Sequence, residues 1–81
     1  MLLNEYIAEK LEKIRKSKKI KVYALCKDAC ISYETYRSIR QVKNKDIFFR
    51  NLLLIIRALG IKPSEFFDDK FISDEIDIDF K

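Results

Sequence analysis

The 81-residue chain contains no histidine and no tryptophan, and it has only one glycine, one proline and two cysteines. Histidine is the side chain that most readily moves protons and binds metals near neutral pH. The chain also lacks a glycine-rich phosphate loop and a serine or cysteine nucleophile with an evident base. These absences argue against an enzyme, and we expect neither a catalytic site nor a cofactor.

The scarcity of glycine and proline also bears on the fold, because these residues mark many of the turns in multi-stranded proteins. A chain of 81 residues is long enough for one hydrophobic core and too short for two. With 48% hydrophobic and 37% charged residues, it can bury that core and remain soluble. The composition therefore favours a single all-α domain with short connections.

Long apolar runs are absent as well. The longest, residues 52–56, is far shorter than a membrane span, and residues 1–5 lack the basic and then apolar pattern of a signal peptide. We expect a soluble, cytoplasmic protein that does not contact membranes.

The two cysteines, Cys26 and Cys30, are four residues apart, so they lie on one face of a helix. A disulfide can form at this spacing but is uncommon, and the pattern favours two buried, reduced thiols. Without histidine, two thiols would need ligands from elsewhere to hold zinc. No metal site is predicted.

Charge is unevenly distributed along the chain. Residues 1–62 hold 15 Lys or Arg and 6 Asp or Glu, a balance of +9, whereas residues 63–81 hold 2 and 7, a balance of −5. A basic body suits a polyanionic partner. The alternative is that the lysines only solvate helix faces.

Hydrophobic periodicity predicts three helices in the first half of the chain. Residues 3–17 form an amphipathic helix, with Asn4 as a cap near its start. Residues 21–29 form a short helix with one buried side, and Ser32 caps a second short helix over residues 33–41. In that helix Tyr36 points inward, and the outward side chains are Tyr33, Glu34, Arg37 and Ser38.

Two more helices are predicted after a polar stretch. Asp46 caps a helix over residues 47–59, which forms the centre of the core. Its apolar stripe consists of Leu52, Ile55, Ile56 and Leu59, widened by Phe48, Phe49 and Leu53. Gly60 provides a left-handed C-terminal cap. Pro63 then begins a short helix that ends near Asp68, with Phe66 and Phe67 packed on the core.

The pattern changes at the C-terminus. Residues 75–80, Glu-Ile-Asp-Ile-Asp-Phe, alternate strictly between acidic and apolar side chains, which is the periodicity of a strand. We therefore divide the chain into a domain over residues 1–69 and an acidic tail over residues 70–81. Residues 72–81 either fray as a solubilising terminus or pair with a partner.

The order of these elements resembles a known family. Residues 7–67 are similar to the lambda-repressor-like (Xre/Cro-type) helix-turn-helix domain. The similarity is carried by Leu11-Glu12-Lys13-Ile14-Arg15, by residues 24–29 and 31–39, and by the long apolar helix ending Ala58-Leu59-Gly60-Ile61 before Ser64-Glu65-Phe66-Phe67. The resemblance implies a compact five-helix DNA-binding domain, here followed by an acidic C-terminal tail.

The resemblance also implies which residues meet DNA. The helix over residues 33–41 would lie in the major groove with four side chains facing bases: Tyr33, Glu34, Arg37 and Ser38. A second set would lie near phosphates: Lys21, Thr35, Arg40, Gln41, Lys43 and Lys45. Arginine can read guanine with two hydrogen bonds, and lysine neutralises phosphate without reading sequence.

Three positions depart from the family pattern. Val22 replaces the glutamine that usually bonds a phosphate, so Lys21 is expected to substitute for it. Cys30 replaces the glycine of the turn, so either the turn geometry shifts or Cys30 is strained. Arg40 replaces an acidic partner of Arg15, so that ion pair cannot form and Arg40 is expected to point toward solvent or phosphate.

The sequence as a whole predicts a small, repressor-like transcriptional regulator that binds specific double-stranded DNA as a homodimer. The alternative is a protein-binding module on the same fold, such as an antitoxin or an anti-repressor. In that case a protein partner would bind through residues 72–81.

Overall fold

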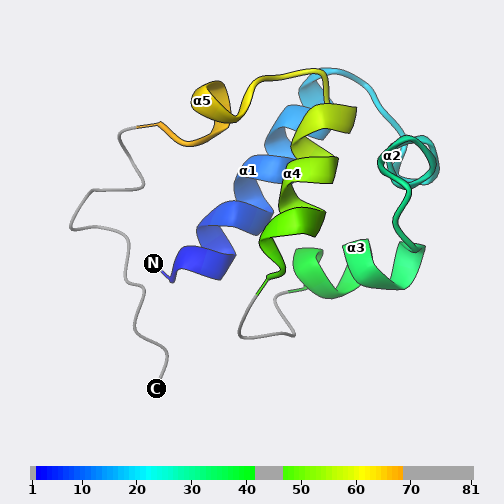
Figure 1. Cartoon of the computed structure of the whole chain (residues 1–81), viewed down its shortest axis with the longest axis horizontal. Helices are drawn as coiled ribbons and strands as arrows, with labels where there is room; N and C mark the ends of the chain where they lie inside the picture. The colour runs from blue at the N-terminus through cyan, green and yellow to red at the C-terminus, as the bar shows by residue number, and fades with distance from the viewer. Residues whose placement is uncertain (1, 42–46, 69–81) are drawn as a thin grey trace.

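The computed structural model describes residues 2–41 and 47–68, and these contain five helices and no β-strand. The helices are α1 (Leu3–Ser17), α2 (Val22–Ala29), α3 (Tyr33–Arg40), α4 (Phe49–Ala58) and α5 (Pro63–Phe66) (Figure 1). The predicted all-α, five-helix architecture is confirmed. The predicted cap Asp46 and the acidic tail over residues 70–81 lie outside the described residues.

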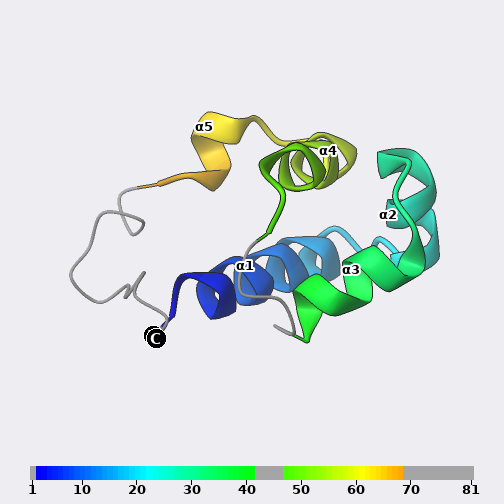
Figure 2. The same cartoon turned by 60° about the horizontal axis from the view of Figure 1, so that its bottom comes forward.

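The two longest helices, α1 and α4, form the middle of the domain, and the three shorter helices lie at its ends. Figures 1 and 2 show α2 and α3 on one side of α1 and α4, and α5 on the other; α3 packs against α1, and both α2 and α5 pack against α4. The arrangement places α3 at an edge of the domain. None of the described helices is both long enough and apolar enough to cross a membrane.

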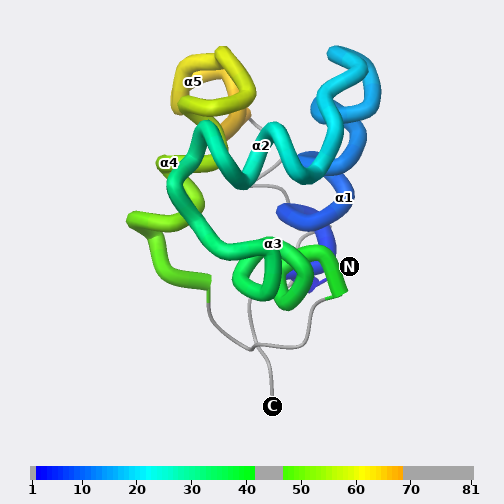
Figure 3. Tube along the Cα trace, turned by 90° about the vertical axis from the view of Figure 1, so that its right-hand side faces the viewer, coloured from blue at the N-terminus to red at the C-terminus, as the bar shows by residue number. Residues whose placement is uncertain are grey.

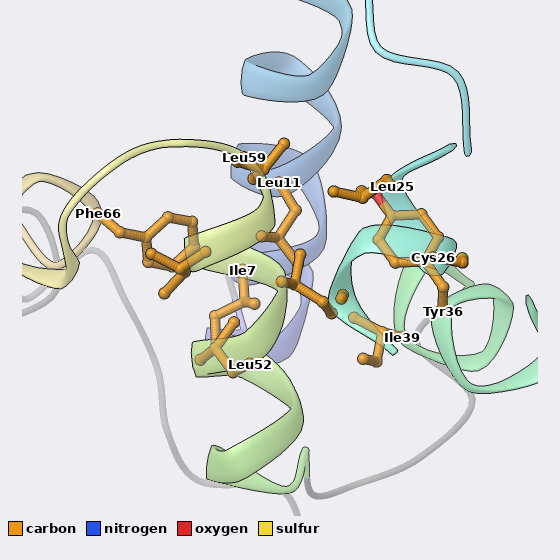
Figure 4. Close-up of a cluster of buried hydrophobic side chains, with 12 residues drawn as sticks. Ile7, Leu11, Leu25, Cys26, Tyr36, Ile39, Leu52, Leu59 and Phe66 are labelled. Atoms are coloured by element: carbon orange, nitrogen blue, oxygen red, sulfur yellow. The ribbon is translucent and has the colours of Figure 1, made fainter. Parts of the chain in front are cut away.

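The buried core draws on every helix (Figure 4). As predicted, α4 supplies Leu52, Ile55 and Ile56, with Leu59 directly after it, and all four side chains are buried. The other buried members of the cluster are Ile7 and Leu11 of α1, Leu25, Cys26 and Ala29 of α2, Tyr36 and Ile39 of α3, and Phe66 of α5. Since side chains from both short helices enter the same core, α2 and α3 are fixed relative to α1 and α4.

The N-terminus of α1 is capped differently from the prediction. Leu2 is the capping residue, and its backbone N–H donates a hydrogen bond of 3.3 Å to Oε1 of Glu5. Asn4 lies inside the helix and is buried. The prediction that Asn4 caps α1 is therefore wrong, because the carboxylate of Glu5 satisfies the helix start instead.

Phe48 and Phe49 do not belong to the core as predicted. Their exposed fractions are 77% and 62%. Because α4 begins at Phe49 and not at residue 47, Phe48 precedes the helix, and Phe49 lies a turn ahead of the buried stripe. The Phe49 ring instead stacks on the half-buried Phe67 ring, with centroids 6.2 Å apart.

Left-handed residues follow three of the helices: Lys19 after α1, Cys30 after α2 and Gly60 after α4. Gly60, at φ 79°, follows α4, and the Ile61 N–H donates to the carbonyl of Ile56, as the predicted left-handed cap requires. Cys30 ends α2 at φ 59°, so a non-glycine residue adopts the left-handed conformation at this turn. Cys30 is exposed, while Cys26 is buried, and both thiols are free. The prediction of two buried thiols is therefore wrong for Cys30.

The helix α5 begins at Pro63 as predicted but ends at Phe66, before Asp68. The Lys62 N–H donates to Oε1 of Glu65 at 2.7 Å, which satisfies the helix start. Beyond the helix, Lys10 Nζ of α1 lies 2.6 Å from Oδ2 of Asp68. This ion pair ties the end of the described chain to α1.

Candidate nucleic-acid interface

A short turn of residues 30–32 joins α2 to α3, and Figure 3 shows α2 passing above α3. Ser32 caps α3, because its Oγ accepts a hydrogen bond of 3.0 Å from the Thr35 N–H. The predicted Ser32 cap is confirmed. Helix α2, the left-handed Cys30 and the capped helix α3 form a compact helix-turn-helix unit. The turn fixes the start of α3, and the buried face fixes the rest of the helix.

The helix α3 has one buried and one outward face. Tyr36, with only 1% of its surface exposed, and Ile39 point into the core. Tyr33 and Glu34 are exposed, and Arg37 and Ser38 are partly exposed beside them, as the sequence predicted. On this face Arg37 Nη1 lies 3.9 Å from Glu34 Oε1, and such an exposed ion pair stabilises little. Breaking this ion pair so that Arg37 and Glu34 bind a ligand instead would therefore cost little free energy.

Three side chains at the contact between α1 and α3 orient the outward helix. Tyr36 Oη donates to Glu12 Oε2 at 2.6 Å. Arg15 Nε and Nη2 donate to the same carboxylate at 3.0 and 2.8 Å, and Arg15 Nη1 donates to the Ile20 carbonyl at 2.6 Å. Glu12 thus joins α1 to α3, and Arg15 joins the same cluster to the segment that leads into α2.

The electrostatics of this cluster follow from its hydrogen bonds. The guanidinium of Arg15, with further help from Tyr36 and Arg40, lowers the pKa of the Glu12 carboxyl, although burial opposes the shift. Glu12 in turn raises the pKa of Arg15. Burial, and then the neighbouring carboxylate, raise the pKa of Tyr36, so its phenol remains a proton donor. The cluster is a stable charged contact and has no group poised for proton transfer near neutral pH.

A comparison with protein families matches residues 10–71 to the Cro/C1-type HTH DNA-binding domain. The chain belongs to this family. The match covers about three quarters of the chain, including α2 to α5 and the second half of α1. Searches of curated proteins and of solved structures found no match. Membership of the Cro/C1-type family supports DNA binding and a part in regulating transcription.

In this Cro/C1-type domain, both the end of α1 and the end of α3 hold an arginine, Arg15 and Arg40, so these two residues do not form an ion pair. Arg15 has Glu12, three residues earlier on the same helix, as its partner. Arg40 is half-buried, and its Nη2 lies 3.5 Å from Tyr33 Oη. Together with four residues of α1, it lines a shallow hollow whose other members are Glu5, Ala8, Glu9 and Glu12. Arg40 therefore faces the acidic side of α1.

The other predicted phosphate contacts differ in exposure and in hydrogen bonding. Lys21 is exposed at the N-cap of α2, and Gln41 is exposed at the C-cap of α3. Thr35 is half-buried, with Oγ1 only 2.8 Å from Ser32 Oγ, so its hydroxyl serves the helix cap. Lys43 and Lys45 lie outside the described residues. Lys21 and Gln41 are thus both exposed, one at the start of α2 and the other at the end of α3.

Sequence reasoning missed the part played by Glu12 and the Tyr36 hydroxyl. The spacing of Glu12 and Arg15, three residues apart on a predicted helix, is a signal for their ion pair. No local pattern links Glu12 to Tyr36, because they are 24 residues apart and meet only through packing of α1 on α3.

Proposed function

We propose that this Cro/C1-type domain is a repressor-like regulator that binds specific double-stranded DNA sites with α3 in the major groove. The observation that carries the proposal is the outward face of α3, where Tyr33, Glu34 and Arg37 stand opposite the buried Tyr36. A helix of this family reads bases from that face, and the buried side fixes its angle to the domain. DNA binding of this kind would place the protein in the cytoplasm with the chromosome.

The side chains divide into base and phosphate contacts. Arg37 is proposed to read guanine through two hydrogen bonds, and Glu34 to accept from the amino group of cytosine. Tyr33 would contact a thymine methyl group or a backbone oxygen, and Ser38 would add a short hydrogen bond. The proposed phosphate set is the predicted one: Lys21, Thr35, Arg40, Gln41, Lys43 and Lys45. To reach a phosphate, Thr35 would have to release Ser32 Oγ, and Arg40 would have to turn from the acidic side of α1.

We propose a homodimer as the functional unit. The α3 helix has eight residues and can contact only a few base pairs. Two copies on half-sites about one helical turn apart would multiply the specificity of one. In this proposal residues 1–69 form the DNA-binding domain, and residues 70–81 form a separate acidic tail.

The second candidate is a protein-binding role on the same fold, as in an antitoxin or an anti-repressor. The alternating acidic and apolar sequence of residues 75–80 favours it, because such a segment can add a strand to a partner. If the tail serves DNA-independent binding, its removal should abolish a protein complex and leave DNA affinity unchanged or improved.

The test of the proposed function is selection of bound duplexes from a random pool. We expect enrichment of a two-fold symmetric sequence with half-sites one helical turn apart. An Arg37→Ala variant should relax the preference at one position in each half-site. Retention of duplexes without any enriched sequence would contradict specific binding.

A further inference from the structure

The outer face of α4 is apolar and is not covered by the described residues. It forms a groove of about 550 Å³, lined by Phe49, Arg50, Leu53, Leu54, Arg57, Ile61 and Pro63. Phe48 and Phe49, both largely exposed, extend the apolar surface at the start of the helix. In a chain with 37% charged residues, a continuous apolar surface of this kind indicates a binding partner.

The groove lies away from the proposed DNA-binding face. The residues of α4 that point into the core are Leu52, Ile55 and Ile56, whereas Arg50, Leu53 and Arg57 of the groove lie on other sides of the helix. In Figure 2, α4 and α3 lie at the top and the bottom of the domain. A partner in the groove would therefore leave the outward side of α3 free.

Two cations bracket the apolar part of the groove. Arg50 and Arg57 are exposed and seven residues apart, which puts them on one side of α4 about 10 Å apart along its axis. Leu53 and Leu54 lie between them. No ion pair joins either arginine to another residue in the described parts of the chain. The groove thus suits an extended ligand that is apolar on one side and acidic on the other.

The chain itself contains a segment of this chemistry. Residues 74–80 read Asp-Glu-Ile-Asp-Ile-Asp-Phe. When extended, such a segment places Ile76, Ile78 and Phe80 on one face and Glu75, Asp77 and Asp79 on the other. The distance from Glu75 to Asp79 is then about 13 Å, close to the spacing of Arg50 and Arg57. Arginine side chains are long enough to reach acidic groups at the edge of a strand while the isoleucines contact the leucines.

We propose that residues 74–80 of a second copy bind in the α4 groove, so that two copies exchange their C-terminal segments. This inference rests on the proposed homodimer and gives it an interface. The described chain ends at Asp68, which is tied to Lys10 of α1. In Figures 1 and 2 this end lies on the side of α5 away from α4, so a chain's own segment would have to turn back over α5. A second copy supplies the segment without that reversal.

Charge reversal in full-length protein tests the exchange. One variant reverses the groove, with Arg50→Glu and Arg57→Glu, and the other reverses the segment, with Glu75→Lys and Asp79→Lys. Each variant alone has like charges facing each other, so dimerisation in sedimentation velocity should weaken about 10- to 100-fold. An equimolar mixture restores both matched contacts and should form a heterodimer of near wild-type affinity.

The control is Lys13→Glu with Lys16→Glu, which changes net charge as the groove variant does but on exposed positions of α1. It should dimerise as the wild type does, and circular dichroism should show that all variants are folded. Monomeric wild-type protein, or a mixture that stays monomeric, would overturn the exchange. Titration of the wild type and of each variant with a random duplex separates the exchange from DNA binding. A wild-type monomer that binds DNA contradicts the homodimer and its interface but not the DNA-binding role.

Discussion

The hydroxyl of Tyr36 donates a hydrogen bond of 2.6 Å to Oε2 of Glu12, and this bond joins α3 to α1. Glu12 also accepts two hydrogen bonds from Arg15. The angle of the proposed recognition helix is therefore set from its buried side, by a residue outside the helix-turn-helix unit. In this chain the cluster stands where the wider family pattern would pair Arg15 with an acidic residue at position 40.

Replacing Tyr36 with phenylalanine removes the hydrogen bond while keeping the buried ring. The acceptor is charged, so Tyr36→Phe should reduce the free energy of unfolding by about 1.5 kcal/mol. Urea denaturation followed by circular dichroism measures this. Tyr33→Phe is the matched control, because half of Tyr33 is exposed, and it should change stability by less than about 0.5 kcal/mol. Equal losses in the two variants would mean that the bond to Glu12 contributes nothing.

The lowered pKa of Glu12 makes part of the stability depend on pH. Its carboxyl has a lower pKa in the folded protein than the ordinary value of 4.5, chiefly because of Arg15, so the unfolded chain binds its proton more readily. The contribution of Glu12 is therefore complete above pH 4.5 and is lost as the pH falls through the lowered pKa.

Comparison with Glu12→Gln isolates this effect from the other carboxylates. The difference in unfolding free energy between wild type and variant should be largest above about pH 5 and should shrink below about pH 4. Denaturation curves across this range provide the measurement. A difference that stays constant, or that grows on acidification, would contradict the assigned pKa shift.

Cys30 stands where a left-handed turn favours glycine. At φ 59° its Cβ is strained, so Cys30→Gly should stabilise the domain by about 1 kcal/mol. Cys30→Ala is the matched control, since it also removes the thiol but keeps Cβ. It should bring no comparable gain in thermal or urea denaturation. If alanine stabilises as much as glycine, the thiol and not the backbone is the source of the strain.

Arg37 is the base contact for which the proposal makes the sharpest energetic prediction. On a selected site, Arg37→Ala should weaken binding by about 1 to 3 kcal/mol, while binding to random duplex should change much less. Lys16→Ala is the control, because Lys16 lies in the last turn of α1, at the end far from α3 in Figure 1. Equal losses on selected and random DNA would show that Arg37 contacts only phosphate.

Much of the fold could be predicted from periodicity and capping alone. The bounds of α1 and the Ser32 cap agree with the prediction, because both depend on local patterns of apolar and hydroxyl side chains. The outward face of α3 could also be predicted, since the positions of Tyr36 and Ile39 fix the buried side.

The errors have a common physical cause. Periodicity assigns a residue to a face of a helix, but it cannot say whether another element covers that face. Phe48 and Phe49 are exposed because α4 starts later than predicted, and Cys30 is exposed because it ends α2 at the turn. The bond between Tyr36 and Glu12 depends on tertiary packing and has no local signature.

The central claim, that the basic domain binds duplex DNA through the α3 face, is tested most directly by fluorescence anisotropy of a labelled random duplex at several salt concentrations. We predict that the logarithm of the affinity falls linearly with the logarithm of the salt concentration, with several counterions released. The Lys21→Ala variant should bind more weakly, and the slope of this line should be smaller by about one. Absence of binding even at low salt would contradict the account and would direct attention to the α4 groove and the acidic tail.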